Sequence, residues 1–139
     1  MCQSALGTKR APNMLTIIDP GPIPLSAIER FDDPDVETAL DQQGLEPATA
    51  TFRLVEVSLT DLQDVRWLPG PRPWDSFTVD ALRAGSALPP IVIIASGESD
   101  APFGILDGLH RTHAYWLLGR PLIRAYELLV AHRRESPPR

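Results

Sequence analysis

From residue 51 onward, the alternation of hydrophobic and polar positions predicts a compact α/β unit. In the segment Thr51–Ser58 (TFRLVEVS), Phe52, Leu54 and, to a lesser degree, Glu56 alternate with Arg53, Val55 and Val57, which is typical of a strand. The β-branched run Ile91–Ala95 predicts a strand buried on both faces. Residues 103–106 predict a short returning strand, and residues 122–129 predict a closing strand. Strands interleaved with helices indicate a single α/β (α+β) domain.

Three helices are predicted, each followed by a glycine. Glycine is the residue that most easily ends a helix, because it adopts the left-handed conformation without strain. They cover residues 34–43, 75–83 and 107–118, and the glycines are Gly44, Gly85 and Gly119. The third helix follows a strand directly, through Asp107 and Gly108.

The first 50 residues have a different character, because prolines interrupt them at residues 19–24 and again at Pro34. We expect an N-terminal extension over residues 1–50, either ordered or partly mobile, without a core of its own. The domain is expected at residues 51–130, and a disordered tail at residues 131–139.

Composition and charge narrow the function classes. With a net charge of −5 and a pI of about 5.1, the chain is poorly suited to direct binding of DNA through its phosphates. Residues 1–50 hold 8 acidic and 3 basic side chains, whereas residues 101–139 hold 6 arginines and 3 acids. The C-terminal third is therefore the expected place for a small anion.

Cysteine content and apolar runs exclude further classes. Cys2 is the single cysteine, so an intrachain disulfide and a cysteine-based metal cluster are excluded. No apolar run reaches the ~20 residues of a membrane helix, and the N-terminus lacks a signal-peptide core. A cytoplasmic protein without a membrane partner is expected.

The segment with most chemical content is residues 103–114 (FGILDGLHRTHA). A strand leads to Asp107 and Gly108, and a helix then begins with His110 and Arg111 in its first turn. The N–H groups of a first helical turn attract anions, and basic side chains there are unfavourable unless something negative compensates them. Gly108 allows close approach of a ligand, and the planar guanidinium of Arg111 suits phosphate oxygens.

Ordinary structural roles are open for the same residues. Asp107 is a good helix cap without any ligand, and His110 and Arg111 fit an exposed helix surface. His113 follows His110 by three residues, which suits either a core-facing residue or a metal ligand, although no third ligand at helical spacing accompanies the pair.

These residues also resemble a known family. The run at residues 89–94 (PPIVII), followed by residues 104–114 (GILDGLHRTHA), is similar to the ParB N-terminal/sulfiredoxin superfamily. The resemblance covers about residues 52–129 and leaves residues 1–50 outside. It implies a ParB/sulfiredoxin-like fold with a mixed sheet. It implies a nucleotide (ADP, ATP or CTP) whose phosphates lie against Gly108, Leu109, His110 and Arg111.

The branches of that superfamily differ in chemistry. The sulfiredoxin branch places a cysteine where this chain has Leu109, which disfavours sulfinic-acid reduction. The ParB branch carries further DNA-binding and dimerisation domains, for which this chain leaves no room after its last predicted strand. The resemblance to the free-serine-kinase branch implies phosphoryl transfer to a small polar metabolite, such as an amino acid with a hydroxyl group.

For that reaction the resemblance implies Mg²⁺ held through Asp107, with Asp107 and Glu56 as catalytic carboxylates. Arg72 and Ser76 are further candidates for phosphate contacts, although Glu56 also suits an exposed strand position and Ser76 a helix cap. The alternative function is a nucleotide-binding sensor or protein-interaction module with little catalysis. In that case, ligand binding would order residues 1–50 or a homodimer face.

Overall fold

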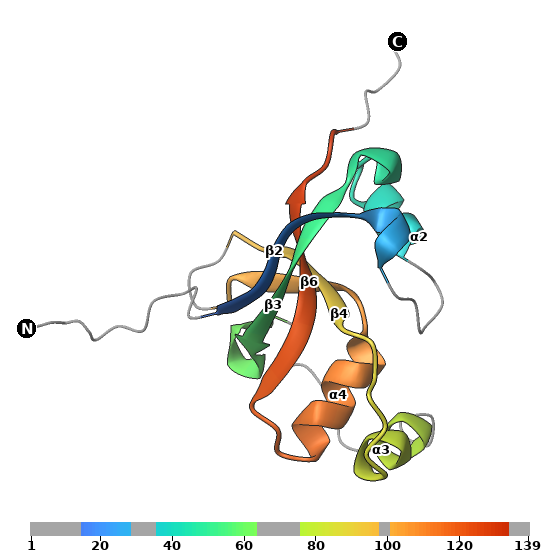
Figure 1. Cartoon of the computed structure of the whole chain (residues 1–139), viewed down its shortest axis with the longest axis vertical. Helices are drawn as coiled ribbons and strands as arrows, with labels where there is room; N and C mark the ends of the chain where they lie inside the picture. Colours follow the sequence, from blue (N-terminus) through green and yellow to red (C-terminus); the bar gives the residue numbers. More distant parts are fainter. Residues whose placement is uncertain (1–14, 29–35, 64–75, 98–100, 134–139) are drawn as a thin grey trace, which may run out of the picture.

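A computed structural model describes residues 15–28, 36–63, 76–97 and 101–133 of the chain. The strands are β2 (Thr16–Pro24), β3 (Thr51–Ser58), β4 (Ile91–Ala95), β5 (Phe103–Asp107) and β6 (Leu122–Val130). The helices are α2 (Val36–Gln42), α3 (Ser76–Arg83) and α4 (Leu109–Leu117), with short 3-10 turns at Leu25–Ala27, Pro47–Thr49 and Leu59–Asp61. Mixed α/β architecture is therefore confirmed (Figure 1).

The five strands form one sheet in the order β2-β3-β6-β4-β5. Strands β4 and β6 run parallel, and the other neighbouring pairs are antiparallel, so the expected mixed sheet is present. Pairing between β4 and β6 begins at Ile91 opposite Ala125, so residues 122–124 of β6 pair only with β3. This offset leaves a notch beside the first residues of β6.

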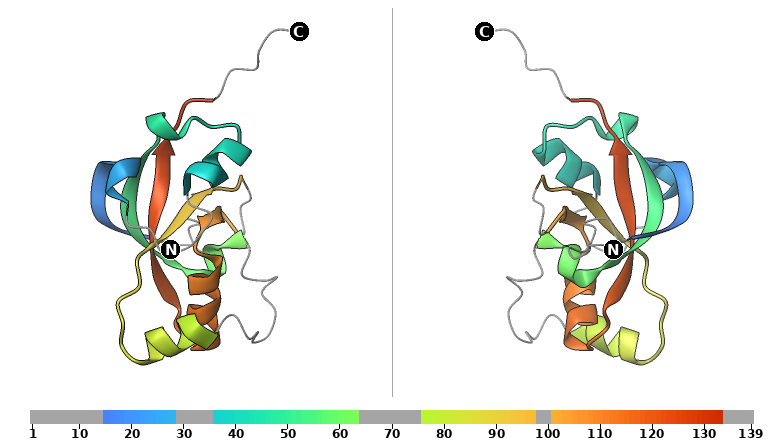
Figure 2. Two further views of the ribbon diagram at one scale, coloured as in Figure 1. Left: turned by 90° about the vertical axis from the view of Figure 1, so that its right-hand side faces the viewer. Right: turned by 90° about the vertical axis from the view of Figure 1, so that its left-hand side faces the viewer.

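Alternate residues along the strands enter two hydrophobic clusters, which therefore lie on opposite faces of the sheet. In β4, Ile91 and Ile93 belong to the cluster that Tyr115 of α4 contacts, whereas Val92 belongs to the cluster that α2 contacts. Figures 1 and 2 show α2 towards the upper end of the sheet and α3 and α4 towards the lower end. A third cluster joins α3 to α4 through Val79, Leu82 and Ala114.

The described part of the N-terminal segment belongs to this sheet and core. Strand β2 contains the proline-rich stretch and pairs with β3, with register shifts on either side of Asp19. An edge strand tolerates proline because one row of its N–H groups has no partner in the sheet. In α2, Val36 and Leu40 are buried, with Leu40 at 0% exposure. The segment that the sequence suggested as an extension thus supplies one of the two edge strands of the described sheet and one helix of the apolar core.

The predicted elements within residues 51–130 agree closely with the structure. Strands β3 and β4 have the predicted bounds, and α3, β5, α4 and β6 differ by only one or two residues at their ends. Gly85 and Gly119 follow their helices with φ of 90° and 71°, in the left-handed region expected of helix-ending glycines. Among the described helices, none is both long and apolar enough to span a membrane.

Candidate functional site

The turn from β5 into α4 depends on a glycine. Gly108 occupies the N-cap position of α4 with φ of 108°, a backbone conformation that other residues rarely adopt. A Cβ atom there would collide with the side chain of Ile91. Because glycine has no side chain, the N-cap residue itself makes no capping hydrogen bond. Asp107 is the last residue of β5, so the helix-cap role left open for Asp107 belongs to Gly108 instead.

Arg111 is the most buried charged residue of this region, at 1% exposure. Its Nη1 donates to the main-chain oxygens of Pro89 at 2.9 Å and Pro90 at 2.7 Å. Its Nη2 donates to Oδ2 of Asp107 at 3.3 Å, and Asp107 is itself 8% exposed. The sequence predicts a direct phosphate contact for Arg111, whereas the structure turns its guanidinium inward. Arg111 therefore connects the start of α4, through hydrogen bonds, to the segment that leads into β4.

The remaining residues of the first turn of α4 lie nearer the surface. Leu109 is 44% exposed, and His110 is half-buried. His113 is fully buried and its ring stacks on Trp116, with centroids 5.9 Å apart. The core-facing interpretation of His113 is therefore confirmed. Among the described residues, no group of three or more His, Cys, Asp and Glu side chains has the arrangement of a metal site.

Glu56 does not lie with Asp107. Glu56 is in β3 and Asp107 ends β5, and the sheet order places two strands between them. Three strand spacings correspond to about 14 Å. Glu56 and Asp107 therefore do not lie on neighbouring strands, whereas a base must lie within hydrogen-bonding distance of the hydroxyl group that it deprotonates. The predicted pair of catalytic carboxylates is not assembled, because sheet order depends on contacts far apart in the sequence.

The side chains of two other predicted phosphate ligands lie outside the part of the chain that the structure describes. Arg72 lies outside the described residues. Ser76 is the first residue of α3, and its side chain also falls outside the described part. Their proposed contacts with phosphate remain predictions.

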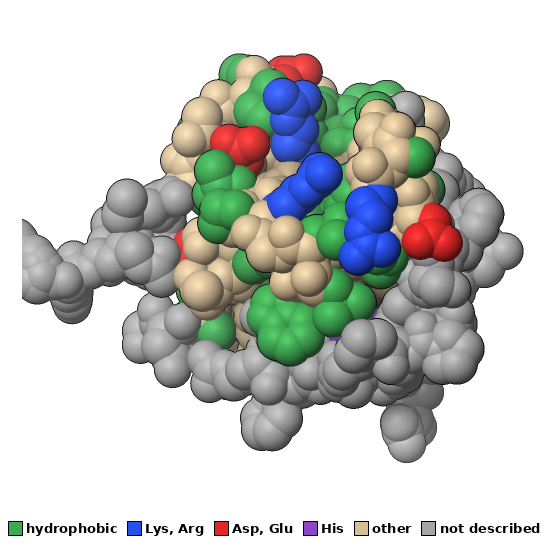
Figure 3. Space-filling view, turned by 90° about the horizontal axis from the view of Figure 1, so that it is seen from below, with side chains coloured by type: hydrophobic (Ala, Val, Ile, Leu, Met, Phe, Trp, Pro, Cys, Tyr) green, Lys and Arg blue, Asp and Glu red, His purple; other side chains and the backbone are tan. Residues whose placement is uncertain are grey.

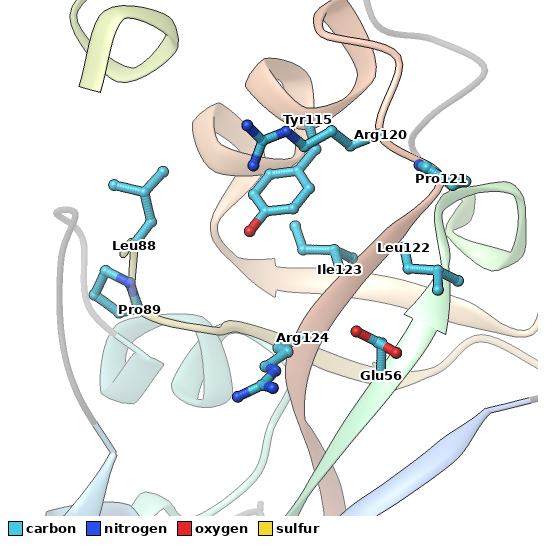
Figure 4. A pocket seen from close by; sticks show the side chains of 9 residues that line it. All are labelled: Glu56, Leu88, Pro89, Tyr115, Arg120, Pro121, Leu122, Ile123 and Arg124. Atoms are coloured by element: carbon cyan, nitrogen blue, oxygen red, sulfur yellow. The ribbon is translucent and has the colours of Figure 1, made fainter. Parts of the chain in front are cut away.

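Glu56 instead borders a pocket of about 360 Å³ at the notch beside β6 (Figure 4). Arg120 and Arg124 line it together with Tyr115, and the Arg120 guanidinium lies 5.8 Å from the centre of the Tyr115 ring. Glu56 and Arg124 are direct cross-strand partners of β3 and β6. Apolar walls come from Leu88, Pro89, Pro121, Leu122 and Ile123.

Sequence reasoning did not single out Arg120, Arg124 or Tyr115. The excess of arginine in residues 101–139 pointed to this end of the chain without naming a site. Seen from below, basic side chains gather across the middle of this face of the molecule (Figure 3). Charge counting could locate the region, whereas only the folded chain brings these side chains to one pocket.

Comparisons with known proteins add little. No protein-family profile matches the chain, and no curated protein matches it. Among solved structures, a crystal structure of sulfiredoxin from Arabidopsis thaliana is similar, with 26% sequence identity and a TM-score of 0.41. The match covers 53% of this chain and 82% of that one. A likeness at this TM-score carries no functional argument.

Proposed function

We propose that the chain binds a nucleotide (ADP, ATP or CTP) with its phosphates at the start of α4. The turn at Gly108 carries this proposal: a strand ends, glycine alone fits the turn, and a nine-residue helix begins. The N–H groups and the positive end of the helix dipole favour an anion at such a terminus. The half-buried His110 adds a side-chain donor in the first turn.

Arg111 supports this site indirectly, because it is a positioning residue. Its three hydrogen bonds link it to Asp107, directly before the Gly108 turn, and to Pro89 and Pro90, which lead into β4. Because the Asp107 carboxylate balances its charge at 3.3 Å, Arg111 contributes the shape of the turn and not a net positive charge.

Asp107 fits the Mg²⁺ that accompanies nucleotide phosphates. Mg²⁺ is commonly held by one or two carboxylates together with phosphate oxygens and water. Asp107 lies directly before the Gly108 turn, beside the proposed phosphates, and its Oδ2 accepts from Arg111. When bound, Mg²⁺ would neutralise part of the phosphate charge.

Phosphoryl transfer to a small polar metabolite, such as a hydroxy amino acid, is the reaction that this site would serve. The position of Glu56, about 14 Å from Asp107 by strand spacing, favours the second candidate function. That function is a nucleotide-binding sensor with little catalysis, which requires phosphate contacts but no base beside Asp107.

Calorimetry with ADP, ATP and CTP, each with and without Mg²⁺, tests the binding step. We expect at least one nucleotide to bind, and His110→Ala to weaken it about tenfold, because a donor to a charged phosphate contributes about 1.5 kcal/mol or more. His132→Ala is the matched control, since His132 is exposed beyond β6. Absence of binding for all three nucleotides would overturn the proposal.

Phosphorus NMR then separates the two functions. A new phosphate-ester resonance with serine or threonine would establish transfer. Nucleotide binding without such a resonance would favour the sensor.

A further inference from the structure

The pocket at the notch beside β6 gathers donors from separate parts of the chain. Tyr115 comes from α4, Arg120 from the turn that follows it, and Arg124 from β6. Figure 4 shows the Tyr115 hydroxyl and both guanidinium ends on the side of β6 that faces Leu88 and Pro89. Glu56 lies on the β3 side of the same strand.

The charges around this pocket select a monoanion. Among the described lining residues, two arginines and one glutamate leave a net charge of +1, which a single carboxylate neutralises. A second negative charge would meet Glu56. The planar fork of arginine matches the two oxygens of a carboxylate, and the phenol of Tyr115 supplies another donor. Within the part of the chain that the structure describes, no side-chain hydrogen bond or ion pair occupies Arg124 or Glu56.

Size and lining limit the rest of the ligand. A volume of about 360 Å³ lies near the lower end of the ~300–1,000 Å³ range of small-molecule sites. Leu88, Pro89 and Ile123 form apolar walls that suit a short hydrocarbon group. We propose that this pocket binds a small organic monocarboxylate.

This site is separate from the proposed phosphate site. Tyr115 is six residues from Leu109 in α4, which corresponds to about 9 Å along the helix axis. Arg111 nevertheless connects the two regions, because it donates to the main-chain oxygen of Pro89, whose ring lines the pocket. Butyrate binding at this pocket does not require a bound nucleotide.

Backbone amide NMR of the full chain, titrated with butyrate, tests the proposal. We expect saturable shifts at Tyr115 and Arg124. Arg124→Gln should weaken butyrate binding about tenfold through loss of a charge-assisted contact. Arg83→Gln is the matched control: Arg83 is an exposed arginine of α3, with 67% of its side chain accessible, and the affinity should not change.

Glu56→Gln tests whether the pocket prefers a negatively charged ligand. Removing the negative charge should strengthen butyrate binding, by up to about fivefold for a partly exposed charge. Succinate and inorganic phosphate should bind the wild-type chain more weakly than butyrate. Tighter binding of butylammonium than of butyrate would overturn the proposal, as would absence of shifts at the pocket or equal weakening by Arg83→Gln.

Discussion

Replacing Arg111 by alanine tests the inward orientation of its guanidinium. The substitution removes three hydrogen-bond donations, to Pro89, Pro90 and Asp107, at 2.7–3.3 Å. It also leaves the carboxylate of Asp107, 8% exposed, without its cationic partner. Breaking a buried ion pair by removing one member typically costs ~3–5 kcal/mol. We expect a loss of about that size in the free energy of unfolding.

Urea unfolding followed by circular dichroism measures this loss, with Arg83→Ala as the control. The Arg83 side chain is 67% exposed, and surface substitutions usually change stability by less than about 0.5 kcal/mol. Because a whole domain is stable by only ~5–15 kcal/mol, Arg111→Ala should lower the urea midpoint strongly.

A double-mutant cycle with Asp107→Asn isolates the ion pair. The 3.3 Å contact indicates that Asp107 and Arg111 interact. The sum of the two single-variant losses in the free energy of unfolding should then exceed the loss in the double variant by about 0.5–3 kcal/mol. The reasoning is refuted if Arg111→Ala stays within about 1 kcal/mol of wild type while nucleotide affinity falls tenfold. That result would mean that the guanidinium faces a ligand.

Three further predictions concern the fold around the site, and thermal or urea unfolding measures each of them. Gly108→Ala should cost about 3 kcal/mol or more, because it combines a φ of 108° with a collision, whereas Gly85→Ala has a φ of 90° in open space and should cost only about 1–2 kcal/mol. Equal costs would contradict the packing argument. Leu40→Ala should cost about 2–5 kcal/mol if α2 belongs to the core, and Gln42→Ala on its exposed side should cost less than about 0.5 kcal/mol. Thr112→Val removes a hydroxyl that donates to the Gly108 oxygen at 2.9 Å and should cost about 1 kcal/mol, and an unchanged stability would argue against that bond.

Most local structure between residues 51 and 130 could be predicted from the sequence. Strand alternation in Thr51–Ser58 and the β-branched run Ile91–Ala95 gave correct bounds, because side-chain periodicity reflects which positions face a core. Gly85 and Gly119 marked where helices end, because a left-handed residue is a local requirement. The strand-to-helix turn at Gly108 could be located for the same reason.

Tertiary structure alone decided how these pieces meet. Strand order separates Glu56 from Asp107 and brings Glu56 beside Arg124, a neighbour 68 positions away in sequence. No local pattern encodes such pairing, since it depends on which strands share a ladder. The inward turn of Arg111 was equally hidden, because its acceptors at Pro89 and Pro90 lie more than 20 residues away. Periodicity predicts whether a residue is buried or exposed. The partners of a buried charge depend on which strands and helices pack together in the folded chain.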